Sequence, residues 1–482
     1  INFSDADSSL YINGGTNSGI ITATNFTLGP NPFTNSGSIS QSGTVNVPFG
    51  STVHVGSSGG TYQVGGVSML GGTLERQGSG AFTIAGSFTQ NSLPGQPSTF
   101  LNLGSTSLSL PALSVTAGTL VFDNAAIGTS ITLSSASMTG GEITHDGETF
   151  AITGALSAPS GTNTFTNASG PASFGSLSTG ASTTFSLLNQ DAGATVTTGS
   201  LSAGNASSLT LEGDIAVTGA TSWNNVAVTL DQSTLLLGGS ITGTPSSFAA
   251  TAPGGLTLGP GAGSLSITTL ALTSSGGSST FNLDNQGAGT LAIGAVSASQ
   301  PFSGDQVTLE RVDGDITINQ LDLGTGIFNL ENTSGVLTIP TVNISGASFG
   351  SGILNNDAAN ALTVKDFTFT EGYLKLAGNV VFDPLAAILC SGSGNLEVDS
   401  NLTLPPIQVV GTSSFTVGGD LGYAPTLGDL NVAPGAALTL GDVVATPGPT
   451  QTVLGALNLG GSITNSGPLF TSRTLGVVDA AG

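Results

Sequence analysis

Charged residues, and basic ones above all, are scarce in this chain of 482 residues. Asp, Glu, Lys and Arg make up only 7% of it, against about 25% in an ordinary soluble domain. Five Lys and Arg stand against 28 Asp and Glu, which gives a formal net charge of −23. Binding to nucleic acid or to anionic membranes requires clustered Lys and Arg. The composition therefore argues against both partners.

Cysteine, long apolar runs and helix-forming residues are scarce as well. The single cysteine, Cys390, excludes an intrachain disulfide, and we expect it to be buried as a small apolar residue. No apolar run reaches the ~18 residues of a membrane span, so we expect no membrane insertion. No signal peptide begins at Ile1, so we expect a mature chain or a part of a longer precursor. The helix-forming residues Lys, Arg and Glu are few, and Gly, Ser, Thr and Asn, which disfavour helix interiors, fill the positions between apolar residues. The sequence therefore predicts an all-β chain.

What the chain does contain is a repeat. An aliphatic residue, a variable residue, a glycine, a small polar or acidic residue and a second aliphatic residue recur in this order. The instances are Leu211–Ile215, Leu237–Ile241, Val312–Ile316, Leu376–Val380, Val417–Leu421 and Leu459–Ile463. The glycines from Gly314 onward are spaced by multiples of about 21 residues, a period typical of solenoids. Repeats of this size bury their apolar residues only by stacking on one another.

A second pattern places Asn shortly after Phe. It occurs at Phe100/Asn102, Phe122/Asn124, Phe165/Asn167, Phe185/Asn189, Phe281/Asn285 and Phe328/Asn332. Alternation puts Phe and Leu on one face of a strand, and Gly and Asn favour the turn that follows. The sequence thus predicts one continuous parallel β-solenoid over residues 1–482, with about 21 residues per coil, irregular insertions at turns and no clear linker.

Short Gly-Gly motifs carry a resemblance to a known group of proteins. They are Gly-Gly-Thr-Leu at 71–74, Gly-Gly-Glu-Ile at 140–143 and Gly-Gly-Ser-Ile at 238–241 and 460–463. These units resemble the passenger regions of autotransporters and filamentous-haemagglutinin-type adhesins. The resemblance implies a right-handed parallel β-helix on a bacterial surface, where such proteins adhere, aggregate cells or build a matrix.

We therefore expect an extracellular structural or adhesive protein of a bacterial cell surface, without enzymatic activity. Neither Ile1–Leu10 nor Arg473–Gly482 has the pattern of a capping helix, so terminal coils should expose unpaired strands. We expect self-association, end to end or laterally, into a filament, fibre or matrix. Host or cell-surface glycans are further expected partners. A passive spacer region of a larger adhesin is an alternative.

A carbohydrate-active β-helix, either a polysaccharide lyase or a hydrolase, is the enzymatic alternative. It would act at Arg311, Asp313 and Asp315, although Asp315 also fits the turn position of the repeat. Asp313 and Asp315 are candidate ligands of Ca²⁺, which takes oxygen ligands. Asp5 and Asp7 are candidates too, because Asp5-x-Asp7-x-Ser9 resembles the start of a calcium loop, but Gly at its sixth position and the closing Glu are missing. No other cofactor is expected.

Two further sets of polar residues, one cluster and one single histidine, are considered as possible functional sites. Glu142, His145, Asp146 and Glu148 could hold a metal ion, but we expect a solvated turn there. His54 lies in an alternating strand and should face solvent.

Ice binding would need Thr-x-Thr in every coil, whereas the outward pairs vary, as in Ser-Leu-Ser at 176–178 and 200–202. We therefore do not expect it.

Overall fold

The structure is a computed structural model, and its described residues form strands and no helix. The described residues are 9–12, 15–28, 33–56, 60–298, 306–324, 326–345, 351–399, 402–419, 425–440, 451–453, 456–465 and 469–471. The strands pair in parallel with strands of the preceding and following turns, as a β-solenoid of about 18 turns with about 22 residues per turn. This confirms the expected all-β class, the parallel solenoid and, to within a residue, its period.

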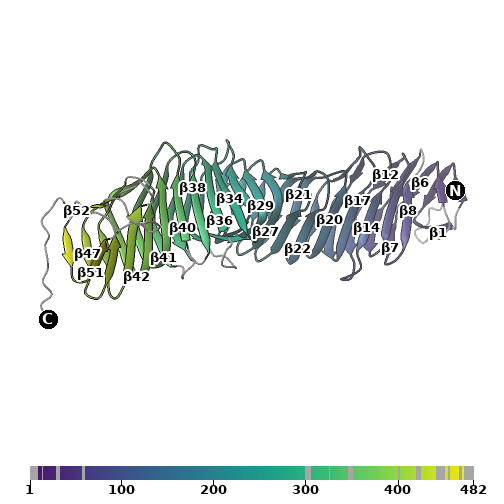
Figure 1. Ribbon diagram of the computed structural model, residues 1–482. Helices are drawn as coiled ribbons and strands as arrows, with labels where there is room; N and C mark the ends of the chain where they lie inside the picture. The colour runs from purple at the N-terminus through teal and green to yellow at the C-terminus, as the bar shows by residue number, and fades with distance from the viewer. Residues whose placement is uncertain are drawn as a thin grey trace. The chain divides into compact units, whose positions relative to one another are not determined.

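Contacts divide the chain into two units. The first unit comprises Ile1–Thr229 and Thr234–Ser246, and the second comprises Leu230–Ser233 and Ser247–Gly482. Within each unit the turns stack strand on strand, as β14 (Ser98–Asn102), β17 (Thr119–Asn124), β20 (Gly141–Gly147) and β22 (Thr162–Asn167) do in the first unit (Figure 1). The single continuous domain over 1–482 stays a prediction.

Three rows of strands make up most turns of the first unit, each row being a column of parallel strands. Row 1 contains β7 (Thr44–Pro48), β10 (Gly66–Leu70), β13 (Phe88–Asn91), β16 (Leu113–Ala117), β19 (Ala136–Met138), the second halves of β21 (Thr149–Ala158) and β23 (Ala172–Thr179), β26 (Leu201–Ala203), β28 (Thr221–Trp223) and β30 (Ile241–Thr242). Row 2 contains β8 (Thr52–Gly56), β11 (Thr73–Gln77), β14 (Ser98–Asn102), β17 (Thr119–Asn124), β20 (Gly141–Gly147), β22 (Thr162–Asn167), β24 (Thr184–Asn189) and the first half of β27 (Ser208–Val217). Row 3 includes β15 (Leu108–Leu110), β18 (Ser130–Leu133), the first halves of β21 and β23, β25 (Val196–Thr198) and the second half of β27.

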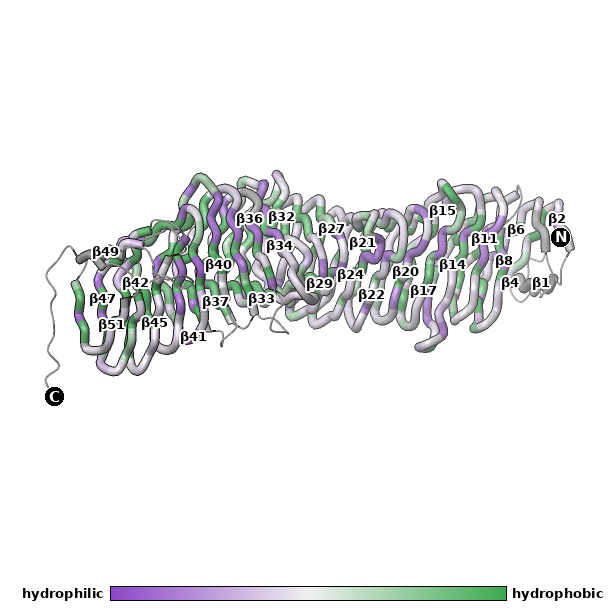
Figure 2. The backbone as a smooth tube through the Cα atoms, viewed as in Figure 1, coloured by the Kyte–Doolittle hydropathy of each residue, from purple (hydrophilic) through white to green (hydrophobic). Residues whose placement is uncertain are grey.

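The core is a stack of inward side chains, because successive residues of a strand point to opposite faces. Figure 2 shows this alternation as apolar and polar stretches along the tube. Phe rings of the first unit stack from turn to turn, with centroid distances of 5.8 Å between Phe100 and Phe122 and 5.1 Å between Phe122 and Phe150. Phe150 and Phe165 follow at 5.9 Å. All four rings are fully buried, and tilted pairs at these distances are favourable.

The second unit follows the same rule with longer strands. One of its columns contains β34 (Ser278–Asn285), β36 (Gln306–Asp313), β38 (Ile327–Asn332), β40 (Ser351–Asn356), β41 (Leu362–Gly378), β42 (Val380–Val398) and β45 (Ser414–Gly419). Its inward positions are in register, so Leu330, Leu354, Leu376 and Val398 lie above one another. All four are buried. The repeat therefore builds one continuous apolar column in this unit.

The repeated glycines and asparagines meet at the turn after these strands. Gly213 has φ +75, and a Cβ placed on it would lie 2.1 Å from the carbonyl oxygen of Asn189 in the turn below. Gly314 and Gly378 have the same φ and face the carbonyl oxygens of Asn285 and Asn356. Only glycine fits where a left-handed conformation coincides with so close an approach of backbone.

The asparagine side chains form a buried ladder at the ends of row 2. Arg76 Nη1 donates to Asn102 Oδ1 (3.0 Å), and Asn102 Nδ2 donates to Asn124 Oδ1 (2.7 Å). Two turns further, Asn167 Nδ2 donates to Asn189 Oδ1 (2.9 Å). All five side chains are buried, so the ladder satisfies polar groups that would otherwise destabilise the core.

Candidate functional site

Row 1 presents an outward column of small hydroxyl side chains. In nine consecutive register steps, each outward residue lies directly above its equivalent in the turn below. The column begins at Asn46 and continues with nine hydroxyl residues, Ser68, Thr89, Ser114, Ser137, Ser157, Ser178, Ser202, Ser222 and Thr242. Each is exposed or half-buried. We call this column, with the one beside it, the hydroxyl face.

The second column of the hydroxyl face contains serine and alanine. Its members are Ser87, Ala112, Ser135, Ala155, Ser176, Ser200, Ala220 and Ser240. Around Thr89, Ser114 and Ser137 the two columns line a shallow groove of about 360 Å³. The two columns together hold no charged residue. The face offers hydroxyl donors and acceptors and small methyl groups at a regular spacing of about 4.8 Å.

Acidic residues of the first unit gather on a different face. Every Asp and Glu among the described residues between 9 and 229 lies on a row 2 strand or in the turn that follows one. They are Glu75, Asp123, Glu142, Asp146, Glu148, Asp191, Glu212 and Asp214. Asp123 and Asp146 are register partners, and burial, together with the nearby charge of Asp146, raises the pKa of Asp123. The unit therefore has one acidic face and one uncharged face.

Glu142 is the acidic residue with the most hydroxyl partners. Its carboxylate accepts hydrogen bonds from Thr119 Oγ1 (3.2 Å), Thr144 Oγ1 (3.3 Å) and Thr166 Oγ1 (3.1 Å). These threonines come from three successive turns, because Glu142 pairs with Thr119 below and Thr164 above. The threonines hold the carboxylate against the sheet.

The expectation of a solvated turn at Glu142, His145, Asp146 and Glu148 is wrong for His145. His145 is fully buried, with Nδ1 2.7 Å from Asn167 Oδ1 and Nε2 2.6 Å from the carbonyl oxygen of Glu148. Its ring stacks on Phe150 at a centroid distance of 5.2 Å. It faces inward because it alternates with buried Ile143 along β20. Asp146, the next residue, is exposed as expected.

The other predicted single residues lie as expected. His54 points outward, with 48% of its side chain exposed, and lies 3.4 Å from Glu75 Oε1. Cys390 is buried, and burial raises the pKa of its thiol. A buried thiol with a raised pKa is a poor nucleophile.

The structure describes only some of the residues predicted for the enzymatic site and for calcium binding. Asp5 and Asp7 lie outside the described residues. Arg311 and Asp313 belong to β36, where the register against β34 shifts just before Asp313, and their side chains are not described. Asp315 is exposed in the turn, and its carbonyl oxygen accepts a hydrogen bond from Asn285 Nδ2 (3.0 Å). In the described part of the chain, no three His, Cys, Asp or Glu residues are grouped as a metal site.

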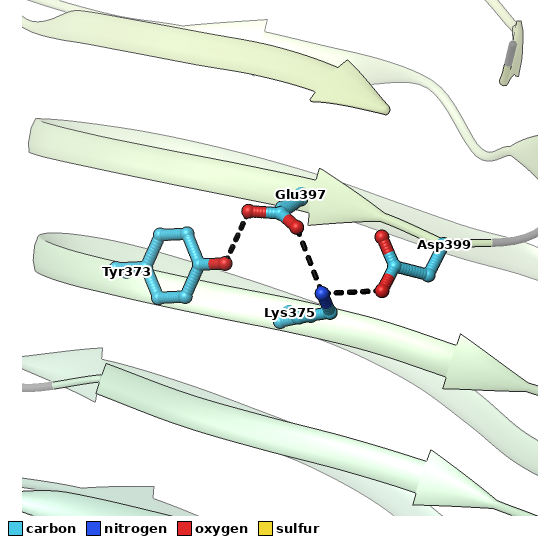
Figure 3. Close-up of polar contacts among 4 residues, drawn as sticks. All are labelled: Tyr373, Lys375, Glu397 and Asp399. Carbon is cyan, nitrogen blue, oxygen red and sulfur yellow. Dashed lines mark hydrogen bonds and ion pairs between the residues drawn. The ribbon is translucent and has the colours of Figure 1, made fainter. Parts of the chain in front are cut away.

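A charged cluster that sequence reasoning missed lies in the second unit (Figure 3). Lys375 Nζ donates to Glu397 Oε1 (2.9 Å) and forms an ion pair with Asp399 Oδ2. The Tyr373 hydroxyl donates to the other oxygen of Glu397, Oε2. Tyr373 and Lys375 are outward residues of β41, and Glu397 is the register partner of Lys375 on β42.

The cluster is largely shielded from solvent. The exposed fraction of the side chain is 23% for Lys375, 5% for Glu397 and 18% for Asp399. Burial lowers the pKa of Lys375, but hydrogen bonds to Asp399 and Glu397 and the charges of both outweigh it, so the net effect is a raised pKa. A partly buried lysine thus lies between two carboxylates. The matching motifs Leu374-Lys375-Leu376 and Leu396-Glu397-Val398 were the sequence signal for this pairing.

Together these observations define the protein as a parallel β-solenoid with chemically distinct faces. No protein-family model matches the chain, and neither a search of curated proteins nor one of solved structures yields a match. Within the described residues, no helix has the length and apolar character to span a membrane.

Proposed function

We propose that this protein is an extracellular structural or adhesive protein of a bacterial surface, and that its hydroxyl face packs against the same face of a second copy. The observation that carries the proposal is the in-register hydroxyl column of row 1. A regular array of small residues lets two sheets approach closely and interdigitate, as in dry sheet interfaces. Such lateral contacts build fibres or a matrix.

The distribution of charge supports a second copy as the partner. The chain carries a formal net charge of −23, so most approaches between copies are repulsive. The hydroxyl face avoids this repulsion, because the acidic residues that the structure describes in the first unit project from row 2 or its turns. Two copies can thus meet through row 1 while their acidic faces point away from each other.

The size of the face fits a specific contact. Nine register steps of about 4.8 Å give a strip about 43 Å long. Two columns of side chains make it on the order of 14 Å wide, since alternate residues of a strand are about 7 Å apart. Such a strip buries on the order of 600 Å² per copy, which reaches the lower end of specific interfaces.

The experiment is sedimentation velocity of the full chain over a range of protein and salt concentrations. We expect assemblies larger than one chain, and we expect salt to strengthen them because it screens repulsion between acidic surfaces. The double variant Ser137→Lys/Ser178→Lys places two cations on the hydroxyl face. We expect it to weaken association at least ~10-fold, since buried unpaired charges are costly.

A matched control places the same two charges on row 2. Thr164→Lys/Ser186→Lys changes the net charge equally at half-buried outward positions. We expect this variant to associate at least as well as the wild type. A wild-type chain that stays monomeric at every concentration and salt, or two variants that weaken association equally, would overturn the proposal.

A further inference from the structure

We propose that Lys375 and Asp399 join in an amide bond between their side chains, with Glu397 as the group that transfers protons. The cross-link would connect two successive turns of the second unit. The ion pair between Lys375 Nζ and Asp399 Oδ2 and the 2.9 Å contact of Nζ with Glu397 Oε1 carry this inference. Such a bond requires an amine, a carboxyl group and a second carboxylate that accepts a proton, and these are Lys375, Asp399 and Glu397.

The strand geometry places both carboxylates against the same amine. Glu397 is the register partner of Lys375. Asp399 lies two residues beyond Glu397, on the same side as Glu397 by alternation, while Val398 between them is buried. The hydrogen bond from Tyr373 occupies Glu397 Oε2, which leaves Oε1 toward the lysine. Lys375 and Glu397 are therefore fixed by strand pairing, and Asp399, the first residue after β42, is held by a hydrogen bond from its backbone nitrogen to Leu376 O (2.9 Å).

The reaction balances without any other reactant. The Lys375 ammonium gives a proton to Glu397, and the freed electron pair of Nζ attacks Cγ of Asp399. The N–C bond forms, and Glu397 returns its proton to the departing oxygen. The C–O bond then breaks, a second proton from nitrogen completes the water molecule, and that water leaves. An ammonium and a carboxylate are thus converted into one amide and one water, and no oxidation or reduction occurs.

Two physical effects favour the bond. Holding reacting groups in contact is equivalent to effective concentrations of about 10⁵–10⁸ M. The amide also replaces an ion pair that is largely removed from water, which relieves the cost of desolvating two charges. The raised pKa of Lys375 means that the amine is protonated before reaction. For that reason the proton transfer to Glu397 is an essential step.

Mass spectrometry of the full chain tests the bond directly. We expect an intact mass lower than the sequence mass by one water molecule. Trypsin cleaves after Lys365, Lys375 and Arg473 in this region, but an amide on Lys375 blocks cleavage there. We therefore expect one peptide, 366–473, that carries the whole mass deficit. Release of 366–375 and 376–473 with unaltered masses would overturn the proposal.

Variants separate this bond from other losses of water. Lys375→Arg and Asp399→Ala should each restore the full mass. Glu397→Gln keeps the shape of the side chain but removes the proton acceptor, and should slow bond formation about 10²-fold or more, the usual contribution of acid–base catalysis. The control Lys365→Arg changes the other lysine and should leave the deficit intact. A deficit that persists in Lys375→Arg would show that the water is lost elsewhere and would refute the cross-link.

Discussion

Replacement of Asn167 by alanine tests whether the buried asparagine ladder holds the turns of the first unit together. Asn167 is fully buried. It donates to Gly170 O and Asn189 Oδ1, each at 2.9 Å, and accepts from His145 Nδ1 at 2.7 Å. Each such hydrogen bond contributes about 1 kcal/mol, and the partners left unpaired cost more. We expect Asn167→Ala to destabilise these turns by about 3 kcal/mol.

Hydrogen exchange is the suitable assay, because turns of a repeat protein open locally as well as globally. A loss of about 3 kcal/mol corresponds to roughly 10²-fold faster exchange of the amides in 162–189. Asn91→Ala is the control, since Asn91 is exposed at the end of β13, and surface changes usually stay within about 0.5 kcal/mol. Equal exchange rates in the two variants would refute the structural role of the ladder.

Three further changes probe other features of the fold. Gly213→Ala combines φ strain with a clash against Asn189 O, whereas Gly50→Ala has φ strain alone. In urea denaturation, Gly213→Ala should lower the free energy of unfolding clearly more than Gly50→Ala, for which we expect a loss of roughly 1–2 kcal/mol. Equal losses in the two variants would contradict the close approach. Phe122→Ala should cost about 3–5 kcal/mol in the same assay, and a loss below about 1 kcal/mol would contradict the ring stack. The pKa of Asp123 is raised on folding, so its charge destabilises the fold at neutral pH. Asp123→Asn should therefore raise the denaturation midpoint at pH 7 and lose this advantage below about pH 4, where the aspartate is protonated in both states; an advantage that is the same at both pH values would contradict the assignment.

The solenoid could be predicted from sequence because its rule is local and repeated. The same alternation of apolar and small residues, closed by Gly or Asn, occurs in turn after turn. The structure adds the reason for both motifs, since Gly213 stacks on Asn189 one turn below. The left-handed φ of Gly213 already favours glycine within its own turn, and the close approach of Asn189 O adds a second reason. The contact between neighbouring turns excludes a Cβ at Gly213, and the Asn189 side chain bonds across turns to Asn167 and to Asp214 O.

Pairings across turns were harder to predict, because the length of a turn varies. Register partners are 26 residues apart for Arg76 and Asn102 but 22 for Lys375 and Glu397. A fixed period of about 21 therefore does not align them. The expectation of a solvated His145 is wrong for another reason: a histidine is polar, but this one alternates with inward Ile143 and therefore faces the core. The alternation along the strand determines which side chains face inward, and a hydrogen bond to Asn167 of the asparagine ladder satisfies the buried His145 ring.

Register between neighbouring turns has a consequence for how such a protein can change in evolution. Thr162–Asn167 and Thr184–Asn189 pair position for position, so residues 162–183 amount to one complete circuit of the backbone. A deletion of this segment in the gene would place Thr184 where Thr162 stood and return an asparagine beside His145. Duplication would insert a circuit just as cleanly. Length can thus be adjusted one circuit at a time with the inward positions kept in register, although some outward contacts change: Leu188 would replace Thr166, whose hydroxyl donates to Glu142.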